Sequence, residues 1–445
     1  MSRGFYNMLL EDIILPVGDM CMGSSIKKEM KRIEKEISGS EAQILSIQKG
    51  KLERVLNHAA ANSAYYKELV TQPNGSSPYE FLKQFPILEK EVVRNRCQDI
   101  IADNSQKLFA QKSSGSSGFQ TKVYWSYDEF SPYRATGLIW WKWAGYNIGD
   151  CLLQTGINTN RGFVKSVKDT IFRTYYLQAF DHRKEELTSA LKWLKKKKDP
   201  VVGGYASSLY ILACHAEEIG CTIKLKTCIS WGDKLFDHYK TKIETIFQTK
   251  VHQNYGSSEG FLMASQKDLD YMYIMSTNVY LEIVDDNGNE VEDGELGHVV
   301  VTNLNNYAMP MIRYRIGDLA IKLPKDQYPA HRELNLPLLQ KVVGRDTDIV
   351  KTKNGNKLVV HSFTGVFEHY QEIKQYQILQ ENLEGITIKY IPGPGLSDEM
   401  IERIQKKLLE MVGDDQFVIN MQKVDHIKAS PSGKPQMIIS KLPRS

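Results

Sequence analysis

Long apolar runs are missing from this chain of 445 residues. No window approaches the roughly 18 uninterrupted apolar residues that a membrane-spanning helix requires. The N-terminal candidate, residues 9–16, is short and carries Glu11 and Asp12, so it fits neither a membrane span nor the apolar core of a signal peptide. We therefore expect a cytoplasmic protein without a membrane partner.

Cysteine is sparse as well, with six residues scattered through the chain. No two of them have the two-residue spacing of a zinc knuckle, so reduced thiols are the simplest interpretation. Cys214, Cys221 and Cys228 are evenly spaced, with His215 beside the first, but a helix followed by a strand favours core packing over a metal site. The sequence leaves open whether these three bind a metal.

An excess of charge of either sign is also lacking. The 57 basic and 53 acidic residues leave a net charge of +4, which is too small to indicate nucleic acid or an anionic membrane as a partner. The dense basic run at 192–198 ends a helical segment, where cations suit the helix dipole and the solvent. With 42% hydrophobic and 25% charged residues, the composition is that of an ordinary globular protein.

What the chain has is an alternation of helix and strand patterns. Apolar residues recur at helical spacing through 25–69 and 131–146, the latter opened by Ser131-Pro132 as cap and first turn, and its tryptophans are expected to pack in the core. Further on we expect helices at 184–194, 207–219 and 235–247 and strands at 200–204, 222–229 and 251–255. Such alternation predicts parallel strands covered by helices, with ligands at the carboxyl ends of the strands.

Antiparallel signals begin at residue 278. A strand pattern at 279–284 leads through a turn at 285–289 to a second strand at 298–302, and Asn354-Gly355 marks another hairpin turn before a helix near 398–411. The fold class is therefore α/β. We expect a large domain at 1–345, with mainly parallel helix-covered sheets and a β-rich subdomain, and a small α+β domain at 346–445.

A small-residue loop lies between two strand-like runs, 107–110 and 123–125. The loop consists of Ser113, Ser114, Gly115, Ser116, Ser117, Gly118, Phe119, Gln120 and Thr121. It can bring backbone N–H groups and hydroxyls against a phosphate, whereas a linker or an expression scar would not be flanked by apolar strands. The loop is not a nucleotide-binding P-loop, because Gly115 and Gly118 are too close together and no lysine directly follows Gly118.

Five further side chains have the chemistry of a nucleotide site. Tyr255 offers a flat face to a nucleobase, and Glu259 offers a hard carboxylate to Mg²⁺. Asp318 can accept hydrogen bonds from ribose hydroxyls, while Arg345 and Lys434 can neutralise phosphate or carboxylate charge. Each also has a structural explanation as a helix-terminal acid, an ion-pair member or a surface lysine.

The order of these motifs resembles the adenylate-forming enzymes, which include acyl-CoA synthetases, nonribosomal peptide adenylation domains and firefly luciferase. Residues 114–118 resemble their phosphate loop, 254–259 their Tyr-Gly-x-x-Glu motif, 314–318 their Tyr-Arg-Thr-Gly-Asp motif, 344–345 the start of their hinge, and 431–434 their terminal lysine motif. Segments 56–67 and 85–90 are similar to the N-terminal signatures of phenylacetate-CoA ligases and their capsule-biosynthesis relatives. The resemblance covers nearly the whole chain.

The resemblance implies a two-step reaction with ATP and Mg²⁺. A carboxylate attacks the α-phosphate to give an acyl-adenylate and pyrophosphate, and a thiol, most simply CoA, then displaces AMP. It assigns the β,γ-phosphates to residues 113–121 and the nucleotide to Tyr255, Gly256, Ser257, Ser258, Asp318 and Arg345. Glu259 would bind Mg²⁺, and Lys434, on a mobile C-terminal domain, would bridge the carboxylate and the α-phosphate.

The acid and the hinge are less well defined. By placement, Tyr205, Ser207, Trp231 and Gly232, with the aromatics around Trp140, would line the acyl pocket, which favours an aryl or medium apolar acid over acetate. Gln120 and Thr121 stand where the family has Pro and Lys, and the hinge residue is left open among Asp346, Thr347 and Asp348.

Two other functions stay open. One is transfer of the acyl group to an amine on a sugar, amino acid or carrier protein, as the capsule-biosynthesis relatives suggest. The other is a non-catalytic nucleotide-binding scaffold, against which the intact set of Glu259, Asp318, Arg345 and Lys434 argues. Small molecules are the expected partners, and the protein is expected to be a monomer or a homodimer.

Overall fold

The computed structural model describes residues 4–71, 77–102, 107–112, 121–156, 162–179, 183–345, 349–367, 369–370, 372–414, 416–427 and 437–442. The phosphate-loop residues 113–120, the hinge positions 346–348 and Lys434 lie outside this part of the chain. What the sequence predicts for them therefore stays a prediction.

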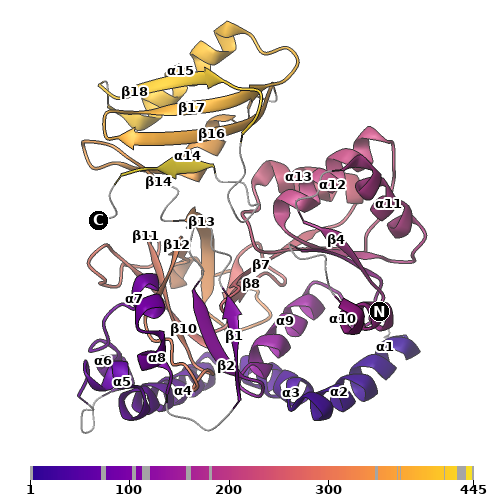
Figure 1. Ribbon diagram of the computed structural model, residues 1–445, viewed down its shortest axis with the longest axis vertical. Coiled ribbons are helices and arrows are strands. Elements are labelled where there is room, and N and C mark those ends of the chain that lie inside the picture. The colour runs from indigo at the N-terminus through magenta and orange to yellow at the C-terminus, as the bar shows by residue number, and fades with distance from the viewer. Residues whose placement is uncertain are drawn as a thin grey trace.

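A mixed sheet of eleven strands dominates the described part of the chain (Figure 1). In spatial order these strands are β10 (Val279–Val284), β11 (Leu296–Asn303), β12 (Tyr314–Lys322), β13 (Leu338–Arg345), β9 (Met272–Ile274), β8 (Phe261–Ser265), β7 (Val251–Ser257), β6 (Thr227–Ser230), β5 (Val201–Gly204), β3 (Leu152–Gly156) and β4 (Thr174–Gln178). Strands β3 to β7 pair in parallel, and β7 pairs antiparallel with β8. The predicted parallel half and the hairpin-rich half thus meet at β7 in one sheet, and the α/β fold class is confirmed.

Helices cover the parallel half as the alternation predicted. These are α10 (Gly162–Ile171), α11 (Lys184–Lys195), α12 (Ala206–Glu218) and α13 (Asp237–Phe247). Leucines of α11 and α12 and Phe247 of α13 pack on Leu153 and Val202 of the sheet. The expected strand at 222–229 begins only at Thr227, because the N–H groups of Leu225 and Lys226 donate to Phe247 and Pro200 outside the ladder.

The N-terminal third of the chain supplies the other helices around the sheet. They are α1 (Phe5–Leu9), a π-helical turn η1 (Leu10–Ile14), α2 (Leu15–Met22), α3 (Ile26–Ile37), α4 (Glu41–Asn62), α5 (Ala64–Lys67), α6 (Pro78–Leu82), α7 (Lys90–Asn95), α8 (Cys97–Ile100) and α9 (Ser131–Trp143). None of the helices within the described ranges has the length and apolar character of a membrane span.

Local sequence explains where the long helices start. A capping box of Ser40 and Gln43 begins α4 and divides the predicted helical stretch at 25–69. Helix α9 begins at Ser131 with Pro132 in its first turn, as expected, although the Ser131 hydroxyl donates to the Tyr127 carbonyl instead of capping. Trp140 is 1% exposed, which confirms the core role predicted for it.

Two short strands flank the phosphate loop. Strands β1 (Leu108–Lys112) and β2 (Lys122–Ser126) pair antiparallel from Leu108 opposite Ser126 to Lys112 opposite Lys122. Both strands predicted on either side of the loop are therefore confirmed. Their pairing places Lys112 and Lys122, which flank the loop, opposite each other.

The C-terminal residues form a separate four-stranded sheet, which lies beyond the end of β13 at the top of Figure 1. It has the order β18 (Val418–Lys423), β17 (Gly385–Pro392), β16 (Ile373–Asn382) and β19 (Ile438–Ser440), and it is accompanied by β14 (Ile349–Lys351), β15 (Lys357–Val359), α14 (Val360–Phe367) and α15 (Asp398–Val412). A 3-10 turn, η2 (Lys325–Gln327), precedes β13. Gly355 has a φ of +87° in the turn between β14 and β15, so the predicted hairpin at Asn354-Gly355 is confirmed. The domain boundary at 345 stays a prediction.

Candidate active site

Glu259 lies in the turn between β7 and β8 and is held from three sides. Its side chain is 4% exposed. One carboxylate oxygen, Oε1, accepts a hydrogen bond from the Tyr314 hydroxyl at 3.4 Å, and Oε2 accepts one from the Ser258 hydroxyl at 3.4 Å. The Glu259 carbonyl accepts from Trp125 Nε1 at 3.1 Å. The backbone is thus fixed to β2, while the long carboxylate contacts leave both oxygens weakly engaged.

Tyr314 links Glu259 to the end of the phosphate loop. Thr121, the last loop residue, is 4% exposed and hydrogen-bonds with the Tyr314 hydroxyl. Burial, followed by the charge of Glu259, raises the pKa of Tyr314 well above its usual value. The hydroxyl therefore stays protonated and can donate to Glu259 at any physiological pH.

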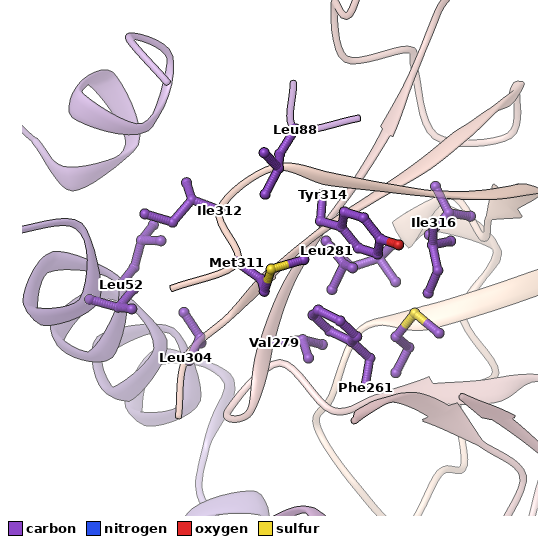
Figure 2. Close-up of a cluster of buried hydrophobic side chains, with 14 of the residues drawn as sticks. Leu52, Leu88, Phe261, Val279, Leu281, Leu304, Met311, Ile312, Tyr314 and Ile316 are labelled. Atoms are coloured by element: carbon purple, nitrogen blue, oxygen red, sulfur yellow. The ribbon is translucent and has the colours of Figure 1, made fainter. Parts of the chain in front are cut away.

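The N-terminal signature at 85–90 positions Tyr314. Leu88 forms a parallel bridge with Tyr314, since the Leu88 N–H donates to the Arg313 carbonyl at 2.9 Å and its own carbonyl accepts from the Arg315 N–H at 3.0 Å. Figure 2 shows the Tyr314 ring facing Phe261, and the two rings stack with centroids 5.7 Å apart. The tyrosine is fully buried, so its hydroxyl has a defined position.

Three of the residues assigned to the nucleotide form a second cluster. The Tyr255 hydroxyl donates to Asp318 Oδ2 at 2.9 Å, and Asp318 is the cross-strand partner of Arg345. Arg345 Nε lies 3.9 Å from Asp318 Oδ1, with the two side chains 35% and 20% exposed. An acid held between a phenol and a guanidinium, and still in contact with solvent, can accept hydrogen bonds from a diol such as ribose.

The turn between the two clusters is shaped by a glycine. A Cβ on Gly256 would lie 2.7 Å from Leu262 Cδ2 and 2.8 Å from the Phe261 carbonyl oxygen, so β7 and β8 approach each other too closely for any other residue. The neighbouring Ser257 hydroxyl is buried without a hydrogen-bond partner in the described part of the chain. An unpartnered donor beside Glu259 suits an anionic oxygen of a ligand.

The predicted acyl-pocket residues lie at the carboxyl ends of β5 and β6. Gly232 has a φ of +85°, and a Cβ there would lie 2.5 Å from the ring of Tyr205. A Cβ on Gly203 would lie 2.7 Å from the ring of Trp231, which stacks on Trp141 with centroids 5.4 Å apart. Each of these two aromatic rings thus lies over a glycine at the carboxyl ends of β5 and β6.

Ser207 has a different environment from the other pocket candidates. Its N–H and its hydroxyl both donate to Asp233 Oδ2, and the Ala206 N–H donates to Asp233 Oδ1. Asp233 therefore caps the N-terminus of α12 from the end of the neighbouring strand. Burial, and then the charge of Asp233, raises the pKa of Tyr205 to about 12.

Two of the three evenly spaced cysteines belong to the hydrophobic core around α12, and Cys214 is half-buried on that helix. Cys228 is buried and Cys221 packs against the same cluster. Burial raises the pKa of Cys228 to about 12 and also raises the pKa of Cys214. Within the described ranges, no three histidine, cysteine, aspartate or glutamate side chains are grouped to hold a metal ion.

Sequence reasoning gave no role to two residues that hold Glu259. In the sequence Tyr314 is only the first residue of the 314–318 motif, although its place four residues before Asp318 on one strand is a usable signal. Trp125 had a weaker signal, since it is one of several aromatics after the loop. Contacts across 134 residues of chain, such as Trp125 to Glu259, cannot be read from local patterns.

Comparisons with known proteins find relatives along most of the chain. Residues 350–441 match the family model described as the CapK C-terminal domain. Protein CapK of Staphylococcus aureus is 20% identical over 414 residues, which covers 90% of each chain. Phenylacetate-coenzyme A ligase of Pseudomonas putida is 30% identical over 164 residues, or 36% of this chain and 35% of that protein.

A solved structure shares the fold along nearly the whole chain. 2-Hydroxyisobutyryl-CoA ligase in the post-adenylation state, in complex with R3-HIB-AMP, superimposes with a TM-score of 0.73 at 18% identity and covers 92% of both chains. The same ligase with 2-HIB-AMP and CoA in the thioesterification state gives a TM-score of 0.59 at 17% identity, covering 92% and 91%.

Proposed function

Because the chain belongs to the adenylate-forming superfamily, in the group of phenylacetate-CoA ligases and capsule-biosynthesis proteins, we propose that it activates a carboxylic acid with ATP. A carboxylate oxygen attacks the α-phosphorus, the bond to pyrophosphate breaks, and an acyl-adenylate forms. The observation that carries this proposal is that strand β12 joins two clusters of predicted site residues. Its Tyr314 contacts Thr121 and Glu259, and its Asp318 contacts Tyr255 and Arg345.

Mg²⁺ is part of the proposal, and the residues present fit it. Magnesium bound to nucleotide phosphates takes one or two protein carboxylates and fills its other positions with phosphate oxygens and water. Glu259, with both oxygens weakly held and the unpartnered Ser257 hydroxyl nearby, supplies one carboxylate of that kind. The metal would neutralise phosphate charge, while Glu259 holds it in place.

The acceptor of the acyl group is proposed to be a thiol, with CoA as the first candidate. The fold shared with a CoA ligase and the partial identity to phenylacetate-CoA ligase support it. Transfer to an amine stays the second candidate, because the relative that matches along 90% of the chain is CapK, whose name specifies no acceptor.

A pyrophosphate-release screen tests the proposal. We expect release with ATP, Mg²⁺ and one class among aryl, medium apolar and short acids. Adding CoA should then consume acyl-adenylate and form a thioester that mass spectrometry detects. Acyl-adenylate that accumulates despite CoA, but disappears with an amine, would move the assignment to the second candidate, and no pyrophosphate with any acid would favour the scaffold.

Tyr255→Phe is expected to weaken ATP binding without affecting chemistry. The change keeps the ring and removes the hydroxyl that donates to Asp318, which costs about 1.5 kcal/mol, or roughly tenfold in KM for ATP, with kcat nearly constant. Steady-state kinetics measure the split. Tyr205→Phe is the matched control, since it removes a half-buried phenol outside the Asp318 cluster and should leave KM for ATP unchanged.

Trp231→Ala is expected to act on the acid instead. The change removes a ring that lies over Gly203 and stacks on Trp141. The proposed acyl pocket would lose that apolar surface, so KM for the acid should rise by about tenfold or more while KM for ATP stays unchanged. Trp193→Ala, a tryptophan of α11 that contacts Tyr175, is the control. If Trp231→Ala and Trp193→Ala change KM for the acid and KM for ATP equally, Trp231 has a structural role and does not contact the acid.

A further inference from the structure

An apolar surface lies on the outer side of the first two helices. Seven of the fifteen large hydrophobic side chains that are exposed in the described residues fall within positions 5–22. We call them the N-terminal ridge, which consists of Phe5 (79% exposed), Met8 (44%), Ile13 (55%), Ile14 (39%), Val17 (49%), Met20 (79%) and Met22 (56%). Isolated exposed hydrophobic residues are ordinary, but such a concentration marks an interaction surface.

Two of the three acids of the same segment are buried, while the third, Asp12, is exposed and pairs with Lys27 at 2.8 Å. Glu11 is 2% exposed and pairs with Lys27 at 3.0 Å and Lys142 at 2.8 Å. Asp19 is 8% exposed and accepts hydrogen bonds from the Ser24 hydroxyl and the Lys27 N–H. A surface helix normally exposes its acids and buries its apolar side chains, so two buried acids beside seven exposed apolar side chains depart from that preference.

The segment is fixed to the body of the protein and is not a loose tail. The Tyr6 hydroxyl donates to the Ile171 carbonyl at 2.6 Å, and Asn7 Nδ2 donates to the Ile148 carbonyl at 2.9 Å. Leu10 is 1% exposed and packs in a cluster that includes Ile148 and Leu152. These contacts hold the apolar side chains of the ridge outward.

Helix α3 adds exposed lysines beside the ridge. Met30, Ile33 and Ile37 are its buried residues, and at 100° per residue Lys28 and Lys35 lie on the opposite side, with Lys31 next to them. These three lysines are exposed and form no ion pair with another described residue. Figure 1 shows α1, α2 and α3 following one another along one edge of the molecule.

We propose that the N-terminal ridge docks the protein on an anionic phospholipid bilayer, with the apolar side chains entering the interface and Lys28, Lys31 and Lys35 over the headgroups. The exposed acids of this region, Asp12 and Glu34, already pair with Lys27 and Lys142, so a second copy of this chain would offer apolar surface but little free negative charge to meet the lysines. A bilayer with anionic lipid offers both. The net charge of +4 does not reveal this local group of lysines, because it sums the charges of the whole chain.

Vesicle flotation of the full chain tests the proposal. We expect binding to phosphatidylcholine mixed with phosphatidylglycerol, little binding to phosphatidylcholine alone, and loss of binding at high salt. The pair Phe5→Ser and Met20→Ser should lower partitioning by about 100-fold, since each removes a large apolar side chain from the interface. Lys28→Gln and Lys35→Gln should lower it by about fivefold each.

Matched controls distinguish binding through the N-terminal ridge from nonspecific binding of the protein to vesicles. Val418→Ser removes a side chain that is 63% exposed elsewhere, and Lys195→Gln with Lys198→Gln removes charge from the basic run after α11. Neither should change flotation. Since the ridge residues are exposed, their variants should keep the thermal unfolding midpoint, and the single Met20→Ser variant serves if the pair does not fold.

Three outcomes would overturn the proposal. The first is flotation that does not depend on anionic lipid, and the second is flotation that the ridge variants leave unchanged. The third is a dimer, detected by light scattering without lipid, that Phe5→Ser and Met20→Ser dissociate, because the ridge would then be an interface between two copies of the chain.

Discussion

Glu259→Gln is expected to lower the rate of acid-dependent ATP–pyrophosphate exchange by about 100-fold or more. The substitution keeps the shape of the side chain and an oxygen that can accept from Tyr314, but it removes the negative charge. A transition state with concentrated phosphate charge loses several kcal/mol when one electrostatic partner is removed, which corresponds to this factor. The loss should appear in kcat and should be partly relieved by raising Mg²⁺.

The interpretation depends on two companion variants. Glu89→Gln removes a carboxylate that pairs with Arg315 on the same strand as Tyr314, and it should leave exchange within about twofold. Tyr314→Phe removes one neutral donor and should cost about tenfold, because the carboxylate and its charge remain. If the Glu259→Gln variant keeps the normal rate of ATP–pyrophosphate exchange, the assignment of Glu259 as a magnesium ligand is wrong.

The sequence predicted the elements that depend on local pattern. Helix α12 and strand β5 follow from apolar spacing, and the hairpin turn at Gly355 follows from a residue that tolerates positive φ. The two strands that flank the phosphate loop, β1 and β2, also follow from short apolar runs. Each of these is set by residues within a few positions of one another.

The sheet order could not be predicted in the same way. The bridge of Leu88 to Tyr314 joins segments more than two hundred residues apart, and strand β9 is inserted between β8 and β13. No periodicity in a single segment encodes its partner. The expected strand at 222–229 was wrong in its first half for this reason, since Leu225 and Lys226 bond outside the ladder.

The candidate site, too, was predicted in some residues and missed in others. Tyr255, Glu259, Asp318 and Arg345 were proposed from motif and chemistry, and the structure brings Tyr255, Asp318 and Arg345 into contact. The link through Tyr314 to Glu259 and Thr121 was not foreseen, because burial of a phenol is a property of the packed core. The exposure of seven large apolar side chains within residues 5–22 could not be predicted for the same reason. Composition does not say which side of a helix faces out.

The largest effect is expected for Lys434→Ala. By motif match, Lys434 bridges the carboxylate of the acid and the α-phosphate, so its removal leaves the attacking oxygen and the leaving pyrophosphate uncompensated. We expect a loss of about 1,000-fold in ATP–pyrophosphate exchange. ATP binding, measured by calorimetry, should stay within about threefold, because the residues assigned to adenine and ribose lie at β7, β12 and β13.

A bypass experiment separates this role from a general loss of function. Supplied with synthetic acyl-adenylate and the acceptor, the Lys434→Ala variant should form product at close to the normal rate, since the lysine is proposed to serve only the first step. Lys441→Ala, which removes an exposed lysine paired with Glu381 beside β19, should leave both steps intact. Slowing of the second step as well would assign Lys434 to transfer in addition to adenylation. Normal exchange in Lys434→Ala would place the catalytic cation elsewhere.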